Sequence, residues 1–89
     1  MFLKDKDAVL DYAVDWTGVT GAERTVVASI WRVSPEGGLA VLEAAVEGGR
    51  AIARLGGGVA GTVYCVGNHV ELSDGTRDER TLVVRVEER

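Results

Sequence analysis

Hydrophobic and polar residues alternate along much of the chain, most clearly in the last third, from Gly61 to Glu88. A period of two is typical of strands buried on one face, because successive side chains point to opposite sides of a sheet. The segment therefore predicts two antiparallel strands joined by a turn at residues 73–76, Ser-Asp-Gly-Thr. One face of this hairpin collects the side chains of Tyr64, Val66, Val70, Leu72, Leu82, Val84 and Val86.

The first two thirds of the chain predict further strands. Residues 8–16 alternate between apolar and acidic positions, and residues 24–33 are rich in β-branched and aromatic residues. We expect this second strand to be covered on both sides, with Val26, Ala28 and Ile30 on one face. Residues 39–46 include helix formers, but a short strand is favoured in an all-β context, and residues 50–55 predict another strand.

Turn-forming residues separate these segments and set the fold class. Strands spaced about 8 to 12 residues apart, with a turn signal between each, predict a sandwich rather than a βαβ layout. The triple glycine at 56–58 is not a phosphate-binding loop, since no Lys-Ser or Lys-Thr follows it. We predict an all-β, immunoglobulin-like antiparallel β-sandwich of about seven strands. It would span residues 8–89 as a single domain, preceded by a polar N-terminal arm at residues 1–7.

Tyr64 follows a turn of small residues at the start of the penultimate strand. In immunoglobulin-like sandwiches, a tyrosine there hydrogen-bonds back across the corner between strands, so Tyr64 is predicted to be a structural corner. The antibody pattern places a cysteine two residues later, where this chain has Val66. Cys65 is the only cysteine and faces the other way, so the predicted sandwich has no disulfide.

Composition and charge narrow the function classes. The 89 residues have room for one domain with one modest core. The net charge of −4 argues against a nucleic-acid partner, because phosphate binding needs a basic patch. The N-terminus lacks the apolar region of a signal peptide, and no run approaches the roughly 18 apolar residues of a membrane span. We therefore expect synthesis in a cytoplasm and no membrane partner.

The sequence predicts neither an enzyme nor a cofactor. His69 is the only histidine, and it is expected on the same face of its strand as Cys65 and Glu71. Aspartates recur in the first fifteen residues, but they lack the glycine turn and closing glutamate of a calcium-binding EF-hand loop. No catalytic, cofactor-binding or metal-binding residues are assigned.

Candidate interface residues come from three places in the chain. Trp16 is expected to pack in the core. For Trp31, packing in the core and anchoring a partner protein are equally good interpretations. The charged segment 77–80 is either a solvated strand end or a polar docking edge, and the arm at residues 1–7 suits strand addition to a neighbour. The candidates are Lys4, Asp5, Lys6, Asp7, Trp31, Arg77, Asp78, Glu79 and Arg80.

Short motifs over nearly the whole chain resemble those of small tailed-bacteriophage virion proteins described as fibre-tail adaptors. The matching residues are Lys4-Asp5, Leu10-Asp11-Tyr12, Asp15-Trp16, Gly61-Thr62, Tyr64, Asn68 and Asp78-Glu79-Arg80. The chain departs from the family pattern at Lys6, where the family has proline, and at Val19, where a second tryptophan is common.

The resemblance implies a noncatalytic structural protein of the virion, made in the host bacterial cytoplasm. Its expected partners are other virion proteins, with multiple copies in a symmetric assembly. Two alternatives stay open at this point. One is a capsid decoration or head-tail junction protein, and the other is a carbohydrate-binding adhesive sandwich that uses Trp16 or Trp31 as a stacking platform.

Overall fold

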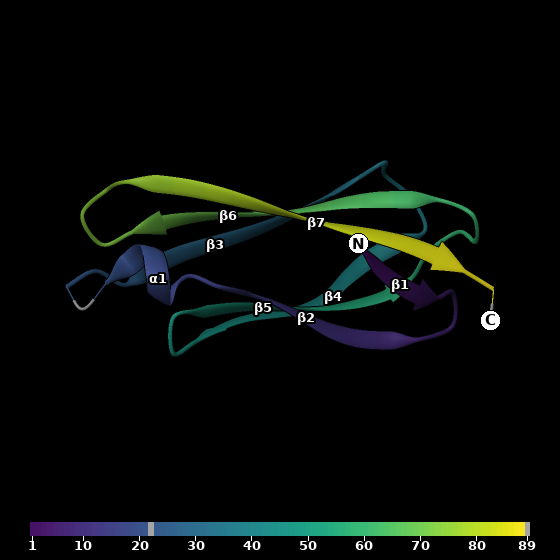
Figure 1. The fold of residues 1–89 in the computed structure, drawn as a ribbon, viewed down its shortest axis with the longest axis horizontal. Helices are drawn as coiled ribbons and strands as arrows, with labels where there is room; N and C mark the ends of the chain where they lie inside the picture. The colour runs from purple at the N-terminus through teal and green to yellow at the C-terminus, as the bar shows by residue number, and fades with distance from the viewer. Residues whose placement is uncertain (22, 89) are drawn as a thin grey trace.

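Two β-sheets pack face to face in the computed structural model, which describes residues 1–21 and 23–88 (Figure 1). The elements are β1 (Phe2–Asp5), β2 (Val9–Asp15), α1 (Thr17–Thr20), β3 (Val26–Ser34), β4 (Leu39–Glu47), β5 (Arg50–Gly57), β6 (Val63–Leu72) and β7 (Arg77–Glu87). One sheet has the order β1-β7-β6-β3, and the other has the order β2-β5-β4. This all-β arrangement of four strands against three confirms the predicted immunoglobulin-like sandwich.

The C-terminal hairpin forms as its pattern predicts. β6 pairs antiparallel with β7, and the predicted apolar face is buried against the other sheet, except that Leu82 is partly exposed. Asp74 closes the turn because its Oδ1 accepts hydrogen bonds from the main-chain N–H of Thr76 at 3.0 Å and from the Thr76 hydroxyl at 2.6 Å. Cys65 is a free, exposed thiol on the opposite face.

The N-terminal residues correct one prediction. Residues 2–5 are not part of a separate arm, because β1 pairs in parallel with the end of β7, with Phe2 opposite Val84. Lys4 is fully buried, and its Nζ donates to the main-chain oxygens of Asp5 at 2.9 Å and Gly57 at 2.7 Å. The sandwich therefore begins at Phe2 rather than at residue 8.

β3 corrects a second prediction. A bulge between Val26 and Ala28 shifts the alternation, so that Val26 is partly buried whereas Ala28 and Ile30 face solvent. The strand is covered on one side only, since Val27 and Ile30 are more than half exposed. The predicted common face of Val26, Ala28 and Ile30 is wrong because the bulge inserts one residue into the pleat.

The core consists of two apolar clusters. One is formed by Tyr12, Leu39, Ala53, Leu55, Tyr64, Val66, Val84 and Val86. The other is formed by Val14, Trp16, Ala51, Val70 and Leu72. Trp31 and Leu82 pack against both clusters and join them. Trp31 thus serves the core, although its buried Nε1 has no hydrogen-bond partner among the described residues.

A buried polar chain joins the two sheets. Trp16, directly after β2, donates from Nε1 to Oδ1 of Asn68 on β6 at 2.8 Å. Asn68 in turn donates from Nδ2 to the Ser29 hydroxyl on β3 at 2.8 Å. Both Trp16 and Asn68 are fully buried, so this hydrogen bond is shielded from water and holds the sheets in one alignment.

We expect Asn68→Ala to lower the free energy of unfolding by about 1–3 kcal/mol, because it leaves the buried Trp16 N–H without an acceptor. Urea unfolding followed by tryptophan fluorescence measures the change. Glu71→Ala, on the exposed side of the same strand, is the matched control and should change stability by less than about 0.5 kcal/mol. Equal losses in the two variants would contradict the role given to Asn68.

Candidate functional site

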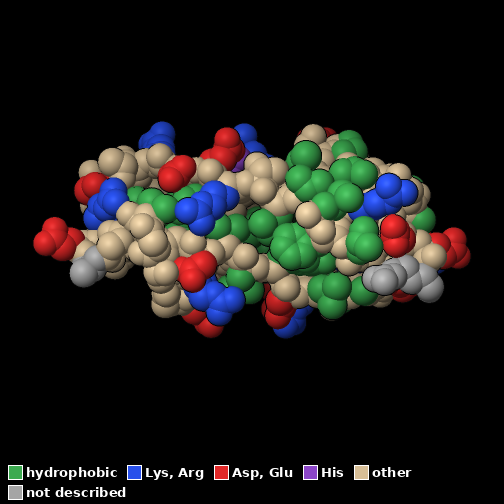
Figure 2. Space-filling view, viewed as in Figure 1, with side chains coloured by type: hydrophobic (Ala, Val, Ile, Leu, Met, Phe, Trp, Pro, Cys, Tyr) green, Lys and Arg blue, Asp and Glu red, His purple; other side chains and the backbone are tan. Residues whose placement is uncertain are grey.

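Five exposed apolar side chains belong to β1, the residue before it and the beginning of β2, and we call this set the N-terminal apolar surface, although Leu3 and Val9 point to the outer faces of different sheets. Its members are Met1, Phe2, Leu3, Val9 and Leu10. Figure 2 shows apolar side chains over this part of the molecule, at the end where Figure 1 places β1. The Phe2 ring packs edge-on against Tyr12, with centroids 5.3 Å apart, and thereby connects β1 to β2 across the side of the sandwich.

The sheet topology explains why these side chains are exposed. β1 and β2 are edge strands of different sheets, so each has a neighbour on one side only. The turn after β1 brings β2 back, with the Ala8 N–H donating to the Asp5 oxygen at 3.1 Å. Lys6 and Asp7 lie in this turn and form an exposed ion pair at 3.3 Å. The surface is therefore apolar, with charged residues at its border.

A second surface lies on the outer face of β3, β6 and β7, and we call it the outer hairpin surface. It is a shallow depression lined by Ala28, Ile30, His69, Val70, Glu71, Arg77, Asp78 and Glu79. His69 Nδ1 lies 3.0 Å from a Glu79 carboxylate oxygen, and Arg77 Nε lies 3.2 Å from Glu71 Oε1. Exposed pairs of this kind contribute about 0–1 kcal/mol each, so they shape the surface more than they stabilise the fold.

The structure does not bring the predicted interface residues together. Arg77, Asp78 and Glu79 lie on the outer hairpin surface. Arg80 instead points to the other side of β7, where its guanidinium lies 4.9 Å from the centre of the Trp16 ring and donates to the Asp15 oxygen at 3.1 Å. Lys4 is buried inside the sandwich and is not available to a partner in this structure.

Tyr64 makes the contact expected of a structural corner. Its hydroxyl oxygen accepts the main-chain N–H of Val59 at 3.0 Å and donates to the Gly37 oxygen at 3.3 Å. The two partners lie on different loops, so one side chain fixes the β5–β6 connection against the β3–β4 turn. Gly38 has a positive φ of 89°, and a Cβ at this position would lie 2.9 Å from the Tyr64 hydroxyl oxygen.

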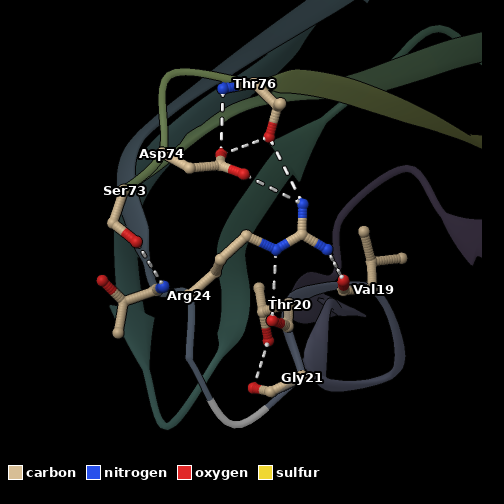
Figure 3. Close-up of polar contacts among 8 residues, drawn as sticks. Val19, Thr20, Gly21, Arg24, Ser73, Asp74 and Thr76 are labelled. Carbon is tan, nitrogen blue, oxygen red and sulfur yellow. Dashed lines mark hydrogen bonds and ion pairs between the residues drawn. The ribbon is translucent and has the colours of Figure 1, made fainter.

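Arg24 holds a polar cluster that sequence reasoning missed (Figure 3). Its guanidinium donates to the main-chain oxygens of Val19 and Thr20, around α1, and to Asp74 Oδ2 at 3.4 Å. The cluster ties the segment between β2 and β3 to the β6–β7 turn. Arg24 is one of several arginines in the chain. The residues next to it in the sequence do not predict its contact with Asp74, which lies fifty residues away.

Among residues 1–21 and 23–88, no group of three His, Cys, Asp or Glu side chains is placed to hold a metal ion. The described helix, α1, has four residues, whereas a helix that spans a bilayer needs about 20. The features that stand out are the two surfaces and the polar contacts that hold the loops.

Comparison with protein families gives a match over most of the chain. Residues 4–85 match the family model described as "Podophage GP4 fiber-tail adaptor protein gp77". The matched segment begins within β1 and ends within β7, so it includes both sheets. No curated protein matches the chain significantly.

Acid should destabilise the protein, because three carboxyl groups have lowered pKa values in the folded state. Hydrogen bonds from Arg54 lower the pKa of Asp11, those from Thr17 lower the pKa of Asp15, and those from Thr76 lower the pKa of Asp74. A lowered folded pKa stabilises the protein above the unfolded pKa, and this contribution is lost as the pH falls through the folded pKa.

We therefore expect the urea midpoint to fall as the pH decreases below the unperturbed carboxyl pKa of 3.8. Asp74→Asn should lose less stability over this range, since it has no carboxylate to protonate in the turn. Glu36→Gln, which removes a carboxylate on the β3–β4 turn, serves as the control. An Asp74→Asn variant with the same pH dependence as the control would contradict the assignment.

Proposed function

The chain belongs to the podophage GP4 fiber-tail adaptor family, and from this premise we propose that it is a noncatalytic structural subunit of a phage tail. Family membership implies a component of the virion and binding to other virion proteins. In our proposal, the chain joins a neighbouring virion protein through protein-protein contacts, and several copies do so around a symmetric assembly. Repetition would convert a weak contact into a stable attachment.

The N-terminal apolar surface is the observation that carries this proposal. Apolar side chains clustered on the surface of a small protein mark interaction sites more often than isolated ones do. Protein interfaces commonly combine an apolar centre with a polar rim. Phe2, Leu3 and Val9 are each about half exposed, and the Lys6–Asp7 pair borders them. The half-exposed Phe2 and Leu3 side chains on β1 therefore fit a protein partner that packs against this edge strand.

The position of β1 suggests how the partner engages. β1 is the edge strand of its sheet, so in the part of the chain that the structure describes its neighbouring strand is β7, on one side. A strand of the partner placed on its other side would gain main-chain hydrogen bonds, while the exposed Leu3 side chain would add apolar contact. In this view, residues 2–5 act as an edge strand that is already formed before assembly.

The two alternative functions, a carbohydrate-binding module and a capsid decoration or head-tail junction protein, require different surfaces. A carbohydrate-binding module needs an exposed aromatic platform, but Trp16 is fully buried and Trp31 packs against both core clusters. A capsid decoration or head-tail junction protein would use the same kind of surface as a tail adaptor. Immunogold labelling of purified particles separates these locations, since our proposal expects the label on the tail.

Leu3→Asp should reduce incorporation into phage particles about tenfold or more, the effect expected when an interface anchor is lost. Quantitative mass spectrometry of particles grown without the wild-type copy measures incorporation. Ile30→Asp is the matched control, since Ile30 is an equally exposed apolar residue on the outer hairpin surface. Both variants must keep the wild-type unfolding midpoint for the comparison to count.

Loss of incorporation in Ile30→Asp but not in Leu3→Asp would move the docking site to the outer hairpin surface. Normal incorporation of both variants would overturn the proposed docking site altogether.

A further inference from the structure

The β6–β7 turn contains the one aspartate of the chain that is followed by glycine, Asp74–Gly75. This pair is prone to isomerisation, because the glycine has no side chain to shield its main-chain nitrogen from the carboxyl group before it. In the reaction, the Gly75 nitrogen bonds to Asp74 Cγ, the amide proton and the carboxyl hydroxyl leave as water, and a succinimide ring forms. Water then opens the ring at the main-chain carbonyl, so that the chain continues through the Asp74 side chain as isoaspartate, with no net change in mass.

The hairpin requires the glycine that makes this pair reactive. Gly75 has a φ of 89°, in the left-handed region where residues with a side chain are strained. A bulkier residue at position 75 would slow the ring closure, but it would also strain the turn. The Asp–Gly pair is therefore built into this hairpin, and its protection has to come from the contacts of the turn.

Hydrogen bonds hold both of the reacting groups (Figure 3). The Gly75 N–H donates to the Leu72 oxygen at 2.9 Å, as in a closed β-turn. Asp74 Oδ1 accepts the main-chain N–H of Thr76 at 3.0 Å and the Thr76 hydroxyl at 2.6 Å. The Arg24 guanidinium lies 3.4 Å from the other carboxylate oxygen, Oδ2. To close the ring, the side chain of Asp74 must leave these partners and the Gly75 nitrogen must leave its own.

The same contacts keep the carboxyl group in its unreactive form. Hydrogen bonds from Thr76, and then the positive charge of Arg24, lower the pKa of Asp74. A protonated carboxyl group can release its hydroxyl as water, whereas an ionised carboxylate is a poor acceptor for the attacking nitrogen. Thr76 and Arg24 therefore oppose the reaction both by position and by charge.

We propose that Thr76 and Arg24 protect Asp74–Gly75 from isomerisation, and that this pair becomes the isoaspartate-forming site of the chain when their contacts are lost. The modification lengthens the main chain by one carbon atom inside a turn that the Leu72 N–H closes on the Thr76 oxygen at 2.8 Å. It would therefore displace the start of β7 from the end of β6. A component of a virion is not replaced after assembly, so slow damage of this kind would accumulate in the particle.

A variant that combines Thr76→Val with Arg24→Gln tests the proposal. Thr76→Val removes the hydroxyl and keeps the main-chain N–H, whereas Arg24→Gln removes the charge beside Oδ2. Ser73→Ala is the matched control, because the Ser73 hydroxyl accepts the Thr25 N–H at 3.1 Å, a contact of the same turn that does not involve the Asp74 carboxylate. The full chains are incubated in warm, neutral buffer. Labelling by isoaspartyl methyltransferase measures isoaspartate, and electron-transfer fragmentation of the peptides locates it.

We expect the folded wild type and Ser73→Ala to isomerise at residue 74 at least about tenfold more slowly than the wild type kept unfolded in urea, the factor expected from hydrogen bonds to a charged group. The double variant should approach the unfolded rate while circular dichroism shows that it is folded. Equal rates in folded and unfolded wild type, or a wild-type rate in the folded double variant, would overturn the proposal. Asn68→Ala weakens the core away from the turn and should keep the wild-type rate. A rate in Asn68→Ala as fast as in the double variant would assign the reaction to global unfolding and would also overturn it.

Discussion

The hydrogen bond from Trp16 to Asn68 is the contact on which the alignment of the two sheets depends. Apolar packing alone is not directional, whereas a buried donor and acceptor must meet at one geometry. Trp16 follows β2 in one sheet, and Asn68 lies on β6 in the other. Asn68 also reaches Ser29 on β3, and Arg80 covers the Trp16 ring from β7. One polar chain thus fixes the register between the layers.

Further polar contacts fix the rest of the sandwich. Lys4 reaches from β1 to the Gly57 oxygen at the end of β5, so the N-terminal strand is held to both sheets. Burial lowers the pKa of Lys4, while the negative charges of Asp5 and Asp7 oppose the shift. Tyr64 ties two loops together, and Arg24 ties α1 to the hairpin turn. Hydrogen bonds that connect the loops to one another thereby add to the stability that the small core provides.

Fixing the core in this way leaves the edges of the sheets for interaction. The β1 and β2 side carries the N-terminal apolar surface. The family match shows the class of protein, whereas the assignment of this side to a partner is our proposal.

The sequence by itself determined the strand class, the C-terminal hairpin and the tyrosine corner, because alternation and turn residues act over short distances. It also pointed to the family through motifs at both ends of the chain. Only the tertiary structure decided that Lys4 is buried, that a bulge turns Ile30 to solvent, and that Arg24 meets Asp74. These outcomes depend on which strands become neighbours, and strand pairing joins residues far apart in the sequence. For the same reason, the exposed surfaces emerged only once the edge strands were known.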